Sequence, residues 1–286
     1  MIRYAKPATL DEALALLGET SWRVLAGGTD FYPAQGTRPL RENILDINGI
    51  GMLRGVVEHE THWSIGARTT WTDIIGRSLP PAFDAMKQAA REIGSAQIQN
   101  VASVAGNLCN ASPAADGVPA LLVLDPEVEL RSAQATRQVP LADFILGNRR
   151  TARRPDELVT AIRVPRTSAS GTSAFVKLGA RRYLVISIAM AAVRLVIEDD
   201  IIRHAAIAVG ACSAVATRLP DVEHALVGRT LHDPLADIVK AAAMPQLAPI
   251  DDVRGSAAYR LDAAREIAAR AVQATACSPS RAEVAA

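Results

Sequence analysis

The chain has 286 residues, of which 49% are hydrophobic and 21% are charged, and its formal net charge is +1. This composition predicts a globular protein with room for two domains, and it lacks the basic footprint of a nucleic-acid-binding protein. Apolar runs such as residues 186–193 are too short to span a bilayer, and the N-terminus lacks the apolar core of a signal peptide. Three widely spaced cysteines form no disulfide framework. We therefore expect a cytoplasmic protein without a membrane span.

The first part of the chain predicts a small α/β lobe over residues 1–52. Thr9 and Glu12 have the spacing of a capping box at the start of a short helix, and apolar strands are expected at 23–26 and 44–47. A second α+β lobe follows over residues 53–170. Its expected elements are a hairpin at 53–58 and 62–67, helices at 71–77, 81–93 and 141–146, a strand pair at 127–131 and 137–140, and a strand at 158–164.

A polar linker at residues 166–172 predicts a boundary between a domain over 1–170 and a second domain over 171–286. In the second domain, apolar runs predict a three-stranded antiparallel sheet, with Asp199-Asp200 as a hairpin turn. Its strands are expected at 173–178, 186–197 and 201–209, its helices at 218–227, 234–243 and 256–275, and a frayed tail at 278–286.

One glycine-rich turn follows a predicted strand. Residues 24–31 read Val-Leu-Ala-Gly-Gly-Thr-Asp-Phe. A strand that runs into such a turn is typical of a loop that cradles a diphosphate with its backbone N–H groups. The pattern is neither Gly-x-Gly-x-x-Gly nor a Walker loop, and a simple turn is the alternative interpretation.

A second polar segment, residues 99–120, contains one carboxylate, Asp116, and many small residues, among them Ser103, Gly106 and Asn107. Small residues let the backbone approach a ligand closely, and their hydroxyl and amide groups supply hydrogen bonds without charge. Ordinary turn chemistry is again the alternative. Because both segments occur in one chain, we predict that they bind one dinucleotide between them, each from one side.

Candidate catalytic groups are missing from the sequence. The five histidines are scattered, no Gly-x-Ser-x-Gly elbow occurs, and three cysteines are too few for an iron–sulfur cluster. We therefore predict no catalytic side chain and no metal site in this chain. The two loops would instead hold a cofactor that performs its own chemistry.

At this point the motifs resemble a known family. Residues 26–30 together with 100–116 resemble the paired FAD signature of the molybdenum hydroxylase flavoproteins, the FAD-binding medium subunits of the xanthine dehydrogenase and carbon monoxide dehydrogenase type. Residues 177–182 and 250–260 resemble two further segments of that family, in the same order. The resemblance implies an α+β fold, with a two-lobed FAD-binding domain of the vanillyl-alcohol-oxidase (PCMH) type and a smaller C-terminal domain of the CO dehydrogenase flavoprotein type.

The resemblance implies that FAD lies extended between the lobes with its diphosphate on both loops. Ile93 and Val159 would pack on the cofactor, Asp116 would accept a hydrogen bond from it, and Lys177 would favour the anionic reduced flavin by its charge. The alternatives are a core position for Ile93 and Val159, a helix N-cap for Asp116 and a surface position for Lys177. The cofactor-binding residues carried over are Val24, Leu25, Ala26, Gly27, Gly28, Thr29, Asp30, Phe31, Ile93, Ala102, Ser103, Gly106, Asn107, Asp116, Val159 and Lys177.

The implied function is an electron-transfer subunit of a heteromeric molybdenum hydroxylase. A small subunit with [2Fe–2S] clusters would deliver electrons to FAD, a large molybdopterin subunit would oxidise the substrate, and the complex is expected to be a dimer of heterotrimers. The alternatives are a stand-alone flavin reductase of the same superfamily and a non-catalytic assembly subunit. Ala105 departs from the family's usual Gly-Gly, and the segment after Arg182 lacks the acidic pair of some NAD-reducing relatives.

Overall fold

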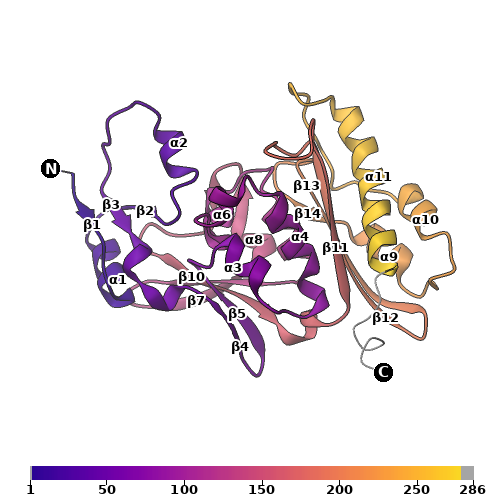
Figure 1. Cartoon of the computed structure of the whole chain (residues 1–286), viewed down its shortest axis with the longest axis horizontal. Coiled ribbons are helices and arrows are strands. Elements are labelled where there is room, and N and C mark those ends of the chain that lie inside the picture. Colours follow the sequence, from indigo (N-terminus) through magenta and orange to yellow (C-terminus); the bar gives the residue numbers. More distant parts are fainter. Residues whose placement is uncertain (1, 278–286) are drawn as a thin grey trace.

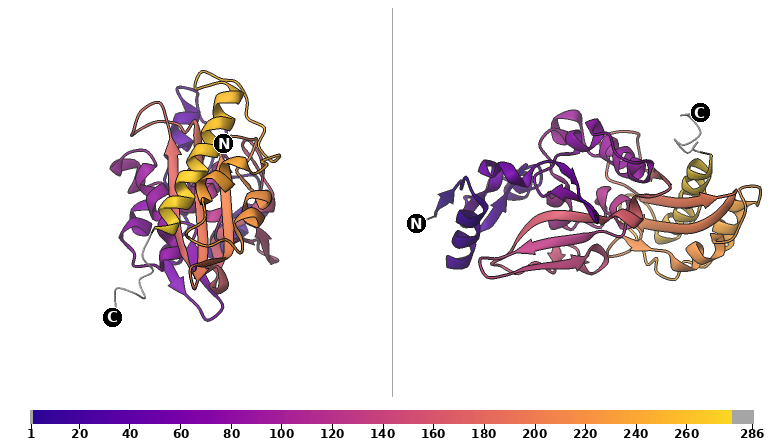
Figure 2. Two further views of the ribbon diagram at one scale, coloured as in Figure 1. Left: turned by 90° about the vertical axis from the view of Figure 1, so that its right-hand side faces the viewer. Right: turned by 90° about the horizontal axis from the view of Figure 1, so that it is seen from below.

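A computed structural model describes residues 2–277 and places three regions in a row along the long axis of the molecule (Figure 1). We call residues 2–52 lobe 1, residues 53–170 lobe 2 and residues 171–277 the C-terminal domain. Figure 2 shows the same order from below, with lobe 1 at one end and the C-terminal domain at the other. The frayed tail expected at 278–286 lies outside the described residues.

Lobe 1 contains a parallel sheet with β3 between β1 and β2. The expected capping box is confirmed, because the Thr9 side chain accepts a hydrogen bond from the Glu12 N–H while the Glu12 carboxylate accepts from the Thr9 N–H. The elements of lobe 1 are β1 (Tyr4–Ala5), α1 (Leu10–Glu19), β2 (Arg23–Leu25), α2 (Phe31–Gln35), β3 (Ile44–Asp46), η1 (Ile47–Gly49) and η2 (Gly51–Leu53).

Lobe 2 is built on an antiparallel sheet in the order β4-β5-β10-β6-β7. Its strands are β4 (Val56–Glu58), β5 (His62–Gly66), β6 (Glu127–Arg131), β7 (Thr136–Pro140), β10 (Leu158–Pro165) and the separate hairpin β8 (Ile145–Gly147) and β9 (Arg150–Thr151). Its helices are α3 (Trp71–Gly76), η3 (Pro81–Phe83), α4 (Asp84–Glu92), α5 (Ala96–Gln99), α6 (Val104–Asn110), α7 (Gly117–Leu122), α8 (Leu141–Phe144) and η4 (Arg166–Ala169).

The second polar segment of the sequence, residues 99–120, begins at the last residue of the short helix α5 and contains the short helix α6. Gly106 and Asn107 are weak helix formers, so intrinsic helix propensity does not predict α6. The structure stabilises this helix through Ser103, whose Oγ accepts a hydrogen bond from the Gly106 N–H at 3.1 Å. Ala105 lies inside α6 and is absent from the residues with positive φ, so its extra methyl group is accommodated without backbone strain.

The C-terminal domain contains the three expected strands and a fourth, β14, which spans only two residues and leaves no periodicity to detect. Asp199 and Asp200 both have positive φ in the turn between the two longest strands, as a tight hairpin requires. The elements are β11 (Thr172–Leu178), β12 (Ala189–Glu198), β13 (Ile201–Gly210), β14 (Thr217–Arg218), α9 (Pro220–Leu226), α10 (Leu235–Ala241) and α11 (Ala257–Ala276).

The sheet of the C-terminal domain is buried on both faces. Along β12, Met190 and Ala192 pack into the core of lobe 2, whereas Ala191 and Val193 pack under the C-terminal helices. Helix α4 of lobe 2 lies against β11, where the Ala85 N–H donates to Ser173 Oγ at 2.8 Å. Lobe 2 and the C-terminal domain therefore share one continuous core, while lobe 1 has small clusters of its own. Over residues 2–277, no helix has the length and apolarity needed to cross a membrane.

Candidate functional site

The first glycine loop leaves β2 with its backbone donors free. Gly28 has φ +74°, and the Asn48 amide donates to the Ala26 carbonyl at 2.8 Å, which ties the loop to the turn after β3. The backbone N–H groups of residues 27–30 donate no hydrogen bond within the described part of the chain. A run of free N–H groups around a left-handed glycine forms a concave site suited to an anion.

The first loop and the second segment meet at Gly27. A Cβ atom on Gly27 would lie 1.9 Å from the Val101 carbonyl oxygen and 3.0 Å from Ala102 Cα. No side chain fits in that space, so glycine is required for lobe 1 and lobe 2 to approach this closely. The two segments predicted to come together in space therefore do so.

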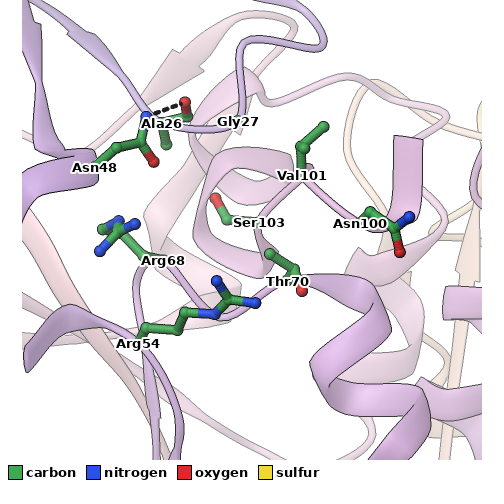
Figure 3. A pocket seen from close by; sticks show the side chains of 9 residues that line it. All are labelled: Ala26, Gly27, Asn48, Arg54, Arg68, Thr70, Asn100, Val101 and Ser103. Carbon is green, nitrogen blue, oxygen red and sulfur yellow. Dashed lines mark hydrogen bonds between the residues drawn. The ribbon is translucent and has the colours of Figure 1, made fainter. Parts of the chain in front are cut away.

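A cavity of about 250 Å³ lies between the two lobes at this contact (Figure 3). The side chains of Arg54 and Arg68 both line it below Gly27 in the view, with Arg68 to the left of Ser103 and Arg54 below Ser103. The lining is almost entirely polar or glycine: Ala26, Gly27, Asn48, Arg54, Arg68, Thr70, Asn100, Val101 and Ser103.

The two arginines of the cavity are held by different contacts. Arg54 forms a two-pronged ion pair with Asp73 at 2.8 and 2.9 Å, and this pairing lowers the pKa of Asp73 below its usual 3.8. Arg68 donates from Nη1 to the Ile50 carbonyl at 2.8 Å. Sequence reasoning missed both residues. A local signal existed for Arg68 alone, since it begins a polar Arg-Thr-Thr run two residues after the end of β5.

Several of the predicted residues gather at this cavity. Ala26, Gly27 and Ser103 line it, and Ala102 contacts Gly27 across the lobe boundary. Gly28, Thr29 and Asp30 continue the first loop, whereas Val24, Leu25 and Phe31 pack within lobe 1.

Gly106 and Asn107 lie in α6 rather than in a loop, as already described. The Asn107 Oδ1 atom is buried and has no hydrogen-bond partner among the described residues. A buried acceptor without a partner is costly. Asn107 is not part of the cavity lining, so the fit to a bound diphosphate rests on the free N–H groups of the first loop and on the guanidinium groups of the cavity.

Asp116 and Lys177 form a separate buried cluster between lobe 2 and the C-terminal domain. Lys177 Nζ lies 2.6 Å from Asp116 Oδ2, and the Ser187 hydroxyl donates to Asp116 Oδ1 at 2.5 Å. Burial raises the pKa of Asp116, while the Lys177 ammonium and the Ser187 hydroxyl oppose that rise. Because the pair is neutral when both groups are charged, it exerts less electrostatic effect than an isolated lysine would.

The alternative role of Asp116 as a capping carboxylate is wrong. Asp116 occupies the N-cap position of α7, but its side chain makes no capping hydrogen bond there. The alternative of a surface position for Lys177 is wrong as well, because its side chain is only 6% exposed. Ile93 and Val159 pack against the core of lobe 2, away from the lining of the cavity.

The fold and the cavity together define a class: a two-lobed nucleotide-binding domain joined through a shared core to an α+β domain. Comparison with known proteins makes the class specific. The family model described as "FAD binding domain in molybdopterin dehydrogenase" matches residues 1–167, and that of the "CO dehydrogenase flavoprotein C-terminal domain" matches residues 174–275.

Related proteins match over nearly the whole chain. The glyceraldehyde dehydrogenase medium chain of Sulfolobus acidocaldarius is 31% identical over 94% of this chain and 96% of its own. The carbon monoxide dehydrogenase medium chain of Afipia carboxidovorans is 33% identical over 94% and 95%. A chain of the reconstituted CO dehydrogenase from Oligotropha carboxidovorans superposes with a TM-score of 0.89 at 29% identity, covering 98% and 99% of the two chains.

This chain belongs to the family of FAD-binding medium subunits of the molybdenum hydroxylases, the xanthine dehydrogenase and CO dehydrogenase type. Its relatives are subunits of oxidoreductases, so it is a component of such an enzyme, and its N-terminal part is an FAD-binding domain.

Proposed function

We propose that this chain binds FAD across the cleft between lobe 1 and lobe 2, with the diphosphate of the cofactor in the cavity at Gly27. The contact that supports this most strongly is the approach of Gly27 to the Val101 carbonyl, which places the start of the loop with free N–H groups, residues 27–30, at a cavity lined by two guanidinium groups. A diphosphate is the part of FAD that such a donor set suits.

We propose that the chain takes electrons from [2Fe–2S] clusters of a small partner subunit and passes them to an external acceptor. When bound, FAD supplies the chemistry that converts one-electron transfer into two-electron transfer. The protein's own residues would bind and orient the cofactor. The loop at Gly27 fixes the position of the diphosphate, and the buried Asp116–Lys177 pair joins lobe 2 to the C-terminal domain on which the flavin end would rest.

The partners in this proposal are the small [2Fe–2S] subunit and a large molybdopterin subunit, assembled as a dimer of heterotrimers in the cytoplasm. The three cysteines of the chain are free and widely spaced, which fits a reducing compartment. Co-expression of the three chains followed by native mass measurement tests the assembly, and recovery of this chain alone would contradict it.

The FAD proposal is tested by purifying the full chain, adding FAD and measuring flavin absorbance after gel filtration. We expect close to one FAD for each chain, and a protein that takes up no flavin would overturn the proposal. In the reconstituted complex, substrate added to the large subunit should bleach the flavin absorbance. Flavin that stays oxidised would contradict the electron-transfer role.

Two alternatives give different results in the same assays. A stand-alone flavin reductase would oxidise NADPH as an isolated chain, whereas we expect no such activity. A non-catalytic assembly subunit would tolerate Gly106→Arg without any change in flavin content. We expect this substitution to abolish flavin retention, because the Gly106 N–H donates to the Oγ atom of Ser103, which lines the cavity, so an arginine side chain at this position would disturb that wall.

A further inference from the structure

Arg68 is a guanidinium group with unused hydrogen-bonding capacity in the cavity. Its Nη1 atom donates to the Ile50 carbonyl, and its Nε atom is buried without any partner among the described residues. A buried donor that belongs to a charged group and remains unpaired is among the costliest features of a folded protein. The Arg68 Nη2 atom also donates no hydrogen bond among the described residues, and Arg68 lines the cavity, so a ligand bound there can supply an acceptor that the chain does not.

Arg54 adds a second cation to the same space. Its Nε and Nη2 atoms are bound to Asp73, which leaves Nη1 without a protein partner. Asp73 is therefore committed to Arg54 and to the Thr70 N–H, and cannot also compensate Arg68.

The charges around Arg68 do not balance. Burial lowers the pKa of Arg68 most strongly, the charge of Arg54 lowers it next, and the attraction of Asp46 opposes these effects more weakly. Asp46 does not line the cavity, and its carboxylate accepts hydrogen bonds from the Tyr4 hydroxyl and the Asn48 N–H. An anion in the cavity would relieve the repulsion between the two guanidinium groups.

We propose that Arg68 and Arg54 form a clamp that binds the diphosphate of FAD from the lobe 2 side, opposite the free N–H groups of residues 27–30. This inference rests on the proposed FAD-binding function. The planar guanidinium fork matches phosphate oxygens, and two forks on one side of a cavity suit two linked phosphates better than one. The chain should therefore bind ADP, which carries the same diphosphate, in competition with FAD, and should not bind adenosine there.

The test is a titration of the full chain with FAD, followed by flavin fluorescence, for the wild type and for Arg68→Gln, Arg68→Lys and Arg54→Gln. We expect Arg68→Gln to weaken FAD binding about 10- to 100-fold, the loss typical of a charge-assisted hydrogen bond. Arg68→Lys should retain part of the affinity, because it keeps the charge but loses the fork. Arg163→Gln is the matched control, since Arg163 is a half-buried lobe 2 arginine paired with Glu129 outside the cavity.

The titration separates the inference from the function on which it rests. A wild type that binds FAD, together with an Arg68→Gln variant of equal affinity, would overturn the clamp and leave the FAD site intact. A wild type that binds no FAD would overturn the proposed function itself. If Arg68→Gln fails to fold, competition experiments with the wild type replace it. We expect ADP to displace FAD from the wild type and adenosine not to displace it. ADP that fails to compete would contradict the clamp.

Discussion

The two boundaries of lobe 2 differ in kind. Towards the C-terminal domain lies what we call the seam, where Met190, Ala192, Ala206 and Ala208 merge with the apolar core of lobe 2. Towards lobe 1 lies the cleft, where glycine, arginine and amide groups surround the cavity. Apolar surfaces in full contact stabilise a fixed arrangement, whereas polar groups with unused hydrogen bonds are suited to a ligand. The seam is therefore a structural boundary, and the cleft is a binding boundary.

Removal of the buried Asp116–Lys177 ion pair at the seam should have the largest effect on stability. Lys177→Met leaves the Asp116 carboxylate buried without its cation, and we expect the free energy of unfolding to fall by about 3–5 kcal/mol at neutral pH. The deficit should shrink in acid, because without Lys177 the raised pKa of Asp116 rises further and the protonated, neutral form is favoured in the folded chain. Urea unfolding at several pH values measures both effects.

Lys240→Met is the control for that variant, because the Lys240–Glu266 pair is exposed and should contribute less than about 1 kcal/mol. A Lys177→Met variant as stable as Lys240→Met would show that the buried pair does not hold the seam together.

A substitution that removes apolar volume from the core of the seam should lower the stability of the chain without changing its affinity for FAD. Met190 is fully buried, and Met190→Ala should lower the free energy of unfolding by about 2–5 kcal/mol. FAD affinity should change less than about two-fold, because Met190 is absent from the cavity lining. Met52→Ala, at a methionine that is 71% exposed, is the matched control. A large loss of FAD affinity in Met190→Ala would erase the distinction between the two boundaries.

A substitution in the cleft should lower the affinity for FAD and leave the stability of the chain almost unchanged. Gly27→Ala places a methyl group on the Val101 carbonyl, so the lobes must separate, and we expect FAD affinity to fall at least about 10-fold. The stability of the ligand-free chain should change much less than in the seam variants. Gly18→Ala serves as control, since a Cβ at Gly18 meets no atom within 4 Å. Equal FAD affinities of Gly27→Ala and Gly18→Ala would contradict the role of the Gly27 contact.

The smallest expected effect concerns the anchor of Arg54. Asp73 accepts from Arg54 and completes the capping box of α3, so Asp73→Asn should cost about 0.5–2 kcal/mol at neutral pH. The folded-state pKa of Asp73 lies below 3.8, so its contribution is present above that pH and is lost as the pH falls through the lowered value. Urea unfolding between pH 6 and pH 3 should show the wild type and variant converging in acid, and a constant difference would refute this origin.

The sequence predicted the local features of the cleft but not its cationic wall. Gly27 and Gly28 follow a strand, which is a pattern visible within a few residues. Arg54 and Arg68 reach the cavity only because lobe 1 docks against lobe 2, so their position depends on contacts between distant parts of the chain. The same limit explains α6, which is too short and too rich in weak helix formers to be recognised, and β14, whose two residues pair only with a strand already in place.

The assignment of Asp116 and Lys177 shows the same limit on the seam side. The resemblance to the family identified both residues, yet their mutual ion pair depends on α7 and β11 being brought together across two regions of the fold. By contrast, the capping box at Thr9 is local, and the spacing of Thr9 with Glu12 predicted it correctly.

The most direct measurement of the central claim is a crystal structure of the full chain loaded with FAD. The account predicts that the diphosphate lies between the backbone of residues 27–30 and the side chains of Arg54, Arg68 and Ser103. A diphosphate bound outside this cavity, with Arg68 still unpaired, would contradict it.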